Sequence, residues 1–391
     1  MDDGTKLSLW TRAATQVESQ QLVDAYNATH KNQVTLTVVP TDSYAAKIGA
    51  AAGAGGLPDM FASDVVFAPN YVAQGLYQDL TADIDALPFK ASLAPSAIKS
   101  GLLNGKEYVI PHVMDMSVLF YNKDLFTKAG LDPNTPPATL SAFAADATAI
   151  SKLGHGVYGT FFGGDCGGCL EFTWWPTGWA DGQQVMNANG TAGNFNSPEM
   201  KSIYKIYRGL FDSGAADPAA KTEAGPTWTG VFPKGNIGIM PMPSSTLGSM
   251  PAGLNIGVAP IPGLNGGQST FVGGDSVGVS KDSKHVQQAW NFLAWTVGDY
   301  AQVEVVAKNH EVMARGDLAN NKYTAGDPRV VLINSLISKG QTPFALQTNS
   351  AINDPNSPWL KLIRDAIFGD ASKIDSDNTA ISAALAQPAT G

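Results

Sequence analysis

The chain has 391 residues, of which 44% are hydrophobic and only 15% are charged, and its formal net charge is −9. This composition supplies apolar material for large cores, predicts two or three domains and argues against a disordered chain. The acidic balance, without a basic stripe in the sequence, disfavours nucleic acid as a partner and electrostatic docking on anionic lipid. The apolar runs all fall short of the roughly 18 residues that a membrane-spanning helix requires.

The first part of the sequence alternates predicted strands and helices. The order strand, helix, strand, helix, strand is typical of right-handed βαβ units and a mostly parallel sheet. Ligands bind such sheets at the carboxyl ends of the strands, where Thr11, Arg12 and Asp64 stand. The predicted strands cover 6–10, 33–40 and 58–64, and the predicted helices cover 16–30 and 43–56.

A second series of elements begins with a hairpin turn at Asn104-Gly105-Lys106. It continues with short strands and with helices, two of which start at the cap residues Thr139 and Ser197. Because no low-complexity linker separates the two series, we expect a second α/β unit that follows the first without a flexible tether. The predicted strands cover 107–111, 116–122, 236–245, 255–263 and 275–280, and the predicted helices cover 123–130, 139–154, 197–214 and 284–298.

Both cysteines, Cys166 and Cys169, lie in a stretch rich in glycine and tryptophan that shows neither a helical nor a strand period. Glycines flank the pair, which favours a loop over the helix start that a redox-active Cys-x-x-Cys motif requires. A structural disulfide in an oxidising compartment is the favoured interpretation. Free or redox-active thiols and a metal site are the alternatives, although the five histidines are scattered along the sequence.

Residues 104–143 read NGKEYVIPHVMDMSVLFYNKDLFTKAGLDPNTPPATLSAF. This stretch resembles the signature passage of the extracellular solute-binding proteins of ABC importers, in the maltose-binding-protein-like sugar-binding family. That passage runs Gly-Lys-x-Tyr-x-x-Pro, an apolar strand, Tyr-Asn-Lys-Asp-Leu-Phe, Ala-Gly-Leu and Pro-Pro-x-Thr-x-x-x-Phe. Further stretches resemble the family in the same order, so that the resemblance covers nearly the whole chain: GGLPDMFASD, FPKGNIGIMPMPSS, NIGVAPIPG and FVGGDSVGVSKDSKHVQQAWNFLAWT. The stretch DCGGCLEFTWWP matches no general pattern of the family, and Met313 stands where proline is common.

The resemblance implies an α/β, two-lobe periplasmic-binding-protein fold, with two or three crossing segments as a hinge and a ligand cleft between the lobes. The crossing segments are expected near 112–116, 270–276 and 314–330. The implied division assigns 1–112 plus 272–314 to lobe 1, and 113–271 plus 315–391 to lobe 2.

The resemblance also implies a function. The chain would be the substrate-binding component of an ABC importer, a monomer without cofactor or metal that captures a mono- or oligosaccharide, or an amino sugar, and delivers it to a permease. The first ten residues, MDDGTKLSLW, lack the segments of a signal peptide, as in a cytosolic protein or a mature exported one. With the resemblance, we expect a lipid-anchored or secreted mature protein in the periplasm or at the cell surface.

Two rival functions remain open. Some members of the family bind glycerophosphodiesters such as glycerophosphocholine, whose choline group would need an aromatic cage. A carbohydrate-active hydrolase is less favoured: it needs two facing carboxylates, which the sequence could supply, but the motifs HExxH and GxxxxGK[ST] do not occur.

A sugar presents apolar C–H faces and hydroxyl edges, so its site needs aromatic rings together with carboxylates, amides or arginine. Several acids around one ligand would favour an amino group on it. Each candidate also has a structural interpretation: core packing for the tryptophans, a solvated loop for the acids and an ion pair for Arg315. The predicted ligand-binding residues are Arg12, Tyr44, Asp64, Asp115, Asp165, Glu171, Trp174, Trp175, Trp228, Ser244, Gly274, Asp275 and Arg315.

Overall fold

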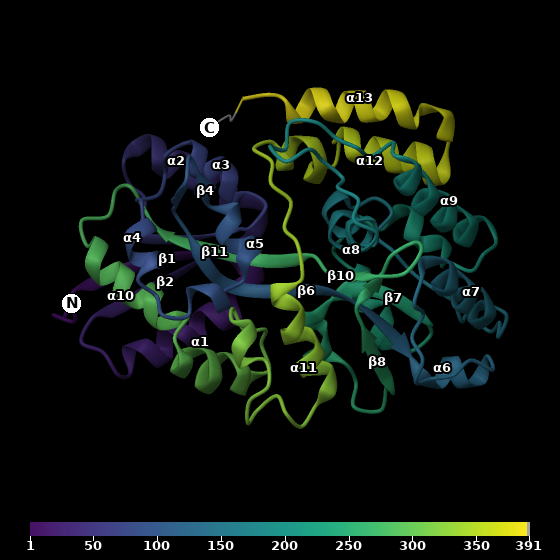
Figure 1. The fold of residues 1–391 in the computed structure, drawn as a ribbon, viewed down its shortest axis with the longest axis horizontal. Coiled ribbons are helices and arrows are strands. Elements are labelled where there is room, and N and C mark those ends of the chain that lie inside the picture. Colours follow the sequence, from purple (N-terminus) through teal and green to yellow (C-terminus); the bar gives the residue numbers. More distant parts are fainter. Residues whose placement is uncertain (389–391) are drawn as a thin grey trace. The chain divides into compact units, whose positions relative to one another are not determined.

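The computed structural model describes residues 1–388, which form two compact units (Figure 1). Each unit is assembled from two separate stretches of the chain. The sequence-based division into lobes stays a prediction, and it differs from these units mainly in 315–344, which group here with unit 1. Unit 1 contains Met1–Asp115 and Val272–Phe344, and unit 2 contains Met116–Phe271 and Ala345–Pro388.

The sheet of unit 1 has the order β2-β1-β3-β11. β1 pairs in parallel with β2 and β3, which confirms the predicted βαβ arrangement. β11, drawn in green in Figure 1, comes from the second stretch of the unit and pairs antiparallel with β3. The strands are β1 (Lys6–Arg12), β2 (Gln33–Val39), β3 (Met60–Asp64) and β11 (Val272–Val279).

Helices pack around this sheet through apolar faces. In α1, Leu22 and Tyr26 lie one turn apart and are both buried. Tyr26 contacts Phe292 of α10 edge to face, with ring centroids 5.0 Å apart. The helices of unit 1 are α1 (Gln16–Asn27), α2 (Thr41–Ala54), α3 (Ala68–Ala73), α4 (Thr81–Asp85), α5 (Pro95–Ser100), α10 (Val286–Thr296) and α11 (Pro328–Ser335).

The predicted hairpin turn at Asn104-Gly105 is confirmed, because it joins β4 (Leu102–Leu103) to β5 (Lys106–Glu107). The two strands predicted after it are in fact one. β6 (Ile110–Asn122) continues through Pro111 and through the residues expected as a crossing segment. Proline is tolerated at the beginning of a strand, so it does not end this one. β6 therefore runs from unit 1 into unit 2 without a break.

In unit 2, β6 pairs antiparallel with β7 (Ile239–Pro243) and β8 (Ile256–Ala259), while β9 (Ile261–Pro262) pairs with β10 (Gln268–Ser269). The two predicted helix caps are confirmed: Thr139 accepts a hydrogen bond from the backbone of Ala142, and Ser197 from that of Met200. The helices are α6 (Lys123–Lys128), α7 (Leu140–Ser151), α8 (Gly167–Ala180), α9 (Pro198–Asp212), α12 (Pro358–Ile363) and α13 (Ile374–Leu385).

Helix α8 corrects the prediction of a loop after the cysteines. It has 14 residues and is buried on nearly all sides, so its sequence shows no amphipathic period that could have revealed it. Trp174 stacks on Tyr207 of α9 at a centroid distance of 4.0 Å, and Trp175 contacts Trp359 of α12 at 5.8 Å. α8 is therefore a central core helix of unit 2. Within residues 1–388, every helix is too short or too polar to cross a bilayer.

Candidate functional site

Polar side chains meet at the carboxyl ends of β1 and β3 in unit 1. Arg12 ends β1, Asp64 ends β3, and Asp275 lies directly opposite Asp64 in the pairing of β3 with β11. Nη1 of Arg12 lies 3.0 Å from Oδ2 of Asp64, and its Nη2 lies 2.5 Å from Oδ1 of Asp275. Thr15 donates a hydrogen bond of 2.8 Å to the other oxygen of Asp275. The predicted site residues Arg12, Asp64 and Asp275 thus form one group together with Thr15. This group is called the arginine–aspartate cluster.

The members of this cluster differ in their access to solvent. The side chain of Asp275 is fully buried, whereas that of Asp64 is 23% exposed. Burial raises the pKa of Asp64, with Arg12 opposing this effect and Asp275 adding to it. Burial lowers the pKa of Arg12, but the Asp275 and Asp64 carboxylates outweigh burial and raise it. One cation thus faces two carboxyl groups, and the carboxyl of Asp64 is the one that a ligand hydroxyl could reach.

Gly274 has a structural role beside the cluster. Its φ is +97°, and a Cβ at this position would lie only 2.0 Å from the carbonyl oxygen of Val113. Only glycine therefore lets the backbone of β11 approach β6 this closely. The carbonyl of Gly274 accepts a hydrogen bond from the backbone of Val65 at 3.1 Å. Contact of Gly274 with a ligand stays a prediction.

Tyr44 and Asp115 were also predicted as ligand contacts in this part of the chain. Tyr44 is buried, and its hydroxyl donates to the carbonyls of Trp10 (3.0 Å) and Ala62 (2.5 Å), so it joins α2 to the sheet. Asp115 is half-buried in β6. The structure therefore gives Tyr44 a packing role and leaves Asp115 partly accessible.

A second polar group in unit 1 escaped the sequence analysis. Glu18 in the first turn of α1 is buried, and its carboxyl oxygens have no hydrogen-bond partner among residues 1–388. The neighbouring Ser19 hydroxyl lies 2.9 Å from Nε2 of His112, which is also buried. Burial lowers the pKa of His112 to about 4. Glutamate is common near helix N-termini, so the pattern gave no sign of this burial.

The Glu18 carboxyl lies in an unfavourable electrostatic environment. Burial raises its pKa well above the usual value, and the carboxylates of Glu311 and Asp115 add to this. Burial, followed by Asp115, also raises the pKa of Glu311. The folded protein therefore holds the proton of Glu18 more tightly than the unfolded chain does, so this group favours folding at low pH. That contribution is lost as the pH rises through the pKa of the folded state.

Glu18→Gln is therefore expected to increase the free energy of unfolding at neutral pH by roughly 1–3 kcal/mol, because the folded protein no longer has to bury a carboxylate or take up a proton to neutralise it. The gain should grow as the pH rises from about 4.5, the usual pKa of glutamate. Chemical unfolding at a series of pH values measures it. Glu304→Gln is the control with opposite sign, because a hydrogen bond from Lys322 lowers the pKa of Glu304. A loss of stability in Glu18→Gln at every pH would contradict the prediction.

The predicted site residues of unit 2 lie on several different elements. Trp174 and Trp175 are fully buried in the core of unit 2, so the described structure exposes neither ring face. Asp165 lies 2.7 Å from the guanidinium of Arg364, and Glu171 is buried in α8. The hydroxyl of Ser244 accepts a hydrogen bond from the backbone of Met116 at 3.0 Å. Of the three predicted tryptophans only Trp228 is half-buried, in a short 3-10 helix (Trp228–Gly230).

Arg315 lies in unit 1 and forms ion pairs of its own. Its guanidinium pairs with Asp299 at 2.5 Å and with Asp317 at 2.6 Å. It also stacks over the ring of Phe89, with 4.0 Å between Cζ and the ring centroid. These contacts correspond to the structural interpretation of Arg315, and its contact with a ligand stays a prediction.

The stretch Gly274-Asp275-Ser276-Val277-Gly278 fits the pattern GxSxG, although it was not expected as a functional motif. In hydrolases the serine of this motif sits on a sharp strand-to-helix turn. Here Ser276 lies inside β11, is fully buried and donates to the carbonyl of Ala97 at 3.4 Å. This context differs from that of a nucleophile. Within residues 1–388, no three His, Cys, Asp or Glu side chains are grouped as metal ligands.

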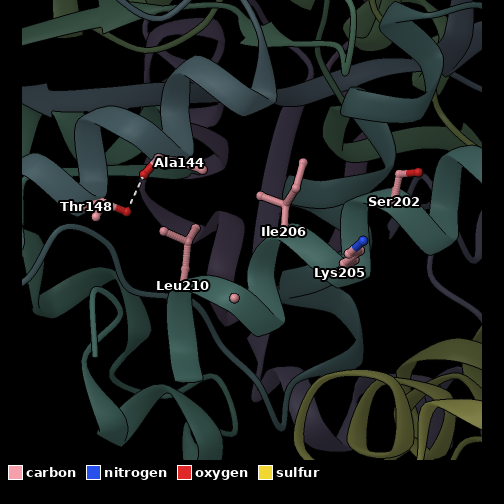
Figure 2. A pocket seen from close by; sticks show the side chains of 7 residues that line it. Ala144, Thr148, Ser202, Lys205, Ile206 and Leu210 are labelled. Atoms are coloured by element: carbon pink, nitrogen blue, oxygen red, sulfur yellow. Dashed lines mark hydrogen bonds between the residues drawn. The ribbon is translucent and has the colours of Figure 1, made fainter. Parts of the chain in front are cut away.

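A hollow of about 430 Å³ lies between α7 and α9 of unit 2. Figure 2 shows Ile206 and Leu210 beside it, and the hydroxyl of Thr148 donating to the carbonyl of Ala144 at 2.7 Å. Lys205 and Ser202 add polar groups. None of the predicted ligand-binding residues lines this hollow, so it does not belong to the predicted site.

The sequence is similar to known bacterial proteins. The family model of the bacterial extracellular solute-binding proteins matches residues 13–303. A protein of Brucella abortus (strain 2308), named only as a binding protein, is 29% identical over 260 residues, which are 66% of this chain and 62% of that protein. The sn-glycerol-3-phosphate-binding periplasmic protein UgpB of the same strain is 28% identical over 226 residues, 53% of this chain and 48% of UgpB. The chain thus spans about three fifths or less of the length of these relatives.

Solved structures share the fold at low sequence identity. The sugar-binding protein MalE of Xanthomonas citri is 19% identical with a TM-score of 0.83, and 98% of each chain is covered. The cyclic alpha-maltosyl-1,6-maltose binding protein of Arthrobacter globiformis is 23% identical with a TM-score of 0.81, over 98% of this chain and 100% of that one. The likeness confirms the predicted two-lobe α/β fold.

Proposed function

Since the chain belongs to the family of bacterial extracellular solute-binding proteins, we propose that it is the substrate-binding component of an ABC importer. It captures a carbohydrate, either a sugar or an amino sugar, outside the cytoplasmic membrane by closure of its lobes, and delivers it to a permease. The extent of the family match supports this proposal, as does a fold shared with proteins whose names specify sugars.

The observation that carries the proposal at the level of residues is the arginine–aspartate cluster. It lies at the carboxyl ends of β1 and β3, where α/β sheets bind ligands. Asp64 is fixed by Arg12 and is partly exposed, so its carboxylate can accept a hydrogen bond from a sugar hydroxyl without rearrangement. Trp228 offers a partly exposed ring that could stack on the apolar face of a sugar.

A glycerophosphodiester is the second candidate ligand, because UgpB of Brucella abortus is a relative over half of the chain. A phosphate needs an available cation or helix N-terminus. The guanidinium of Arg12 already faces two carboxylates, and that of Arg315 faces Asp299 and Asp317. A neutral or cationic ligand therefore fits the cluster better than an anionic one.

Asp64→Asn is expected to weaken sugar binding by about 10- to 100-fold, because a hydrogen bond to a charged group contributes roughly 1.5–3 kcal/mol. Isothermal titration calorimetry with sugars, amino sugars, polyols and glycerophosphodiesters measures the affinity, while chromatography checks each mixture for products. Asp79→Asn is the matched control, since Asp79 forms a surface ion pair with Lys106 and should leave the affinity unchanged.

The outcomes of this experiment separate the candidates. Binding of a sugar without product, weakened only by Asp64→Asn, supports the proposal. Binding of glycerophosphodiesters alone would keep the receptor and replace its ligand. Steady release of product would contradict a receptor and favour the hydrolase.

A further inference from the structure

We propose that Cys166 and Cys169 form a thiol–disulfide exchange site, in which Cys166 is the sulfur that an incoming dithiol attacks. The two residues form a disulfide, as predicted, with their Cα atoms 5.3 Å apart. Their position differs from the expected loop: Cys166 is the N-cap of α8, and Cys169 lies in its first turn. A Cys-x-x-Cys motif at a helix start is the context in which such pairs react with thiols.

The helix start favours a thiolate on Cys166. The first backbone N–H groups of a helix have no partner within it, and the helix dipole places positive charge at this end. In α8 the N–H of Cys169 donates to Sγ of Cys166 at 3.1 Å. Because such donors stabilise the thiolate more than the thiol, they make Cys166 a good leaving group when the mixed disulfide is resolved.

The two cysteine residues differ in exposure. Cys166 is half-buried, whereas only 7% of Cys169 is exposed. Gly225 lies next to the half-buried Cys166: the φ of Gly225 is +117°, and a Cβ there would lie 3.1 Å from Sγ of Cys166. Glycine at this position thus leaves out a side chain that would crowd this sulfur. An external thiol therefore reaches Cys166, while Cys169 is placed to attack from within.

Two carboxylates, Asp165 and Glu223, lie near the pair. Asp165, which precedes Cys166, is paired with Arg364 at 2.7 Å. Glu223 accepts a hydrogen bond from the backbone of Gly225 at 2.8 Å. The ion pair offsets the charge of Asp165, so Glu223 is the group that opposes the approach of a negatively charged thiolate.

The exchange balances in two steps. A thiolate of the dithiol attacks Sγ of Cys166, the disulfide bond breaks, and Cys169 leaves as a thiolate that takes up a proton. The second thiol of the dithiol then attacks the dithiol's first sulfur, which is bonded to Cys166 in the mixed disulfide. This step releases Cys166 as a thiolate, which also takes up a proton. The protein disulfide is reduced by two electrons and the dithiol is oxidised to its cyclic disulfide.

The short spacing also argues for a chemical role. In the chain-entropy account, a disulfide stabilises a protein more when it closes a longer loop. Here only two residues separate the cysteines, so the bond restricts the unfolded chain far less than a long-range bond would. The disulfide therefore contributes little to the stability of the fold, so stability alone does not explain the two cysteines.

The test uses the full chain under native conditions with dithiothreitol as the dithiol. We expect the disulfide to be reduced while the near-ultraviolet circular dichroism of the protein is retained. Alkylation of the released thiols and mass spectrometry measure the extent of reduction. In Cys169→Ser, Cys166 should react with iodoacetamide at pH 6 at least about tenfold faster than Cys169 reacts in Cys166→Ser. Resistance of the disulfide until the protein unfolds, or equal rates for the two single variants, would overturn the proposal.

A second variant tests the local electrostatics without touching either cysteine. Glu223→Gln should speed the reduction by dithiothreitol about twofold or more at low ionic strength, and the difference should shrink in high salt. Glu304→Gln, in unit 1, is the matched control and should leave the rate unchanged. If Glu223→Gln and the original protein are reduced at equal rates at low salt, the assignment of Cys166 as the attacked sulfur is contradicted.

Discussion

Arg12→Met is expected to lower the free energy of unfolding by about 3–5 kcal/mol, the usual cost of removing one partner from a buried ion pair. The substitution leaves the fully buried carboxylate of Asp275 and the largely buried one of Asp64 facing each other without their cation. Chemical unfolding at neutral pH, followed by circular dichroism, measures the loss. The loss should shrink in acid, because protonation of the two carboxyl groups removes the uncompensated charge.

Arg329→Met is the matched control for this substitution. Arg329 also pairs with an aspartate, Asp327, at 2.6 Å, but both side chains are about one third exposed. Pairs of this kind contribute roughly 0–1 kcal/mol, so the control should change stability little. Equal losses in the two variants would show that the burial of the arginine–aspartate cluster does not persist in solution.

Trp174→Ala is expected to lower the free energy of unfolding by about 3–5 kcal/mol, as large-to-small substitutions of buried aromatic residues do. The indole is fully buried, stacks on Tyr207 and contacts Phe162 at a centroid distance of 5.3 Å. Its removal would leave a cavity between α8 and α9 that the packed neighbours can fill only in part. Thermal or chemical unfolding measures the loss.

Trp228→Ala is the control, and it also tests the prediction that tryptophans of this chain contact the ligand. Trp228 is half-buried in a short 3-10 helix, so its removal should cost less than about 1 kcal/mol. If the ring stacks on a sugar, the affinity should fall while stability is kept. A Trp174→Ala variant of unchanged stability and reduced affinity would instead identify Trp174 as a ligand platform.

The regular elements could be predicted from the sequence because they have one apolar face or a clear boundary. Helix α9, with its apolar face and its cap Ser197, is one example, and the turn Asn104-Gly105 is another. α8 was missed because a helix that is buried on all sides has no period. β6 was divided at Pro111 because local rules treat proline as a strand boundary, whereas a proline near the start of a strand is tolerated.

The site was predictable where strand order alone brings residues together. Arg12 and Asp64 stand at the ends of predicted strands, whereas Asp275 was expected from the family resemblance, and the structure joins all three. Ser19 and His112 meet only through the packing of α1 on β6, which no local pattern encodes. The role of the tryptophans could not be predicted either, because a cluster of rings in the sequence is equally consistent with a binding surface and with a core. Trp174 lies in the core.

The chain passes through the two units in the order 1, 2, 1, 2, which has a consequence for its biosynthesis. The sheet of unit 1 lacks β11 until residue 279 has been made, and the core around Trp175 lacks Trp359 until residue 359 has been made. Neither core can close while the N-terminal half emerges alone, since contacts distant in sequence form late and slowly. Each unit therefore completes its core only after the second of its two stretches has been synthesised.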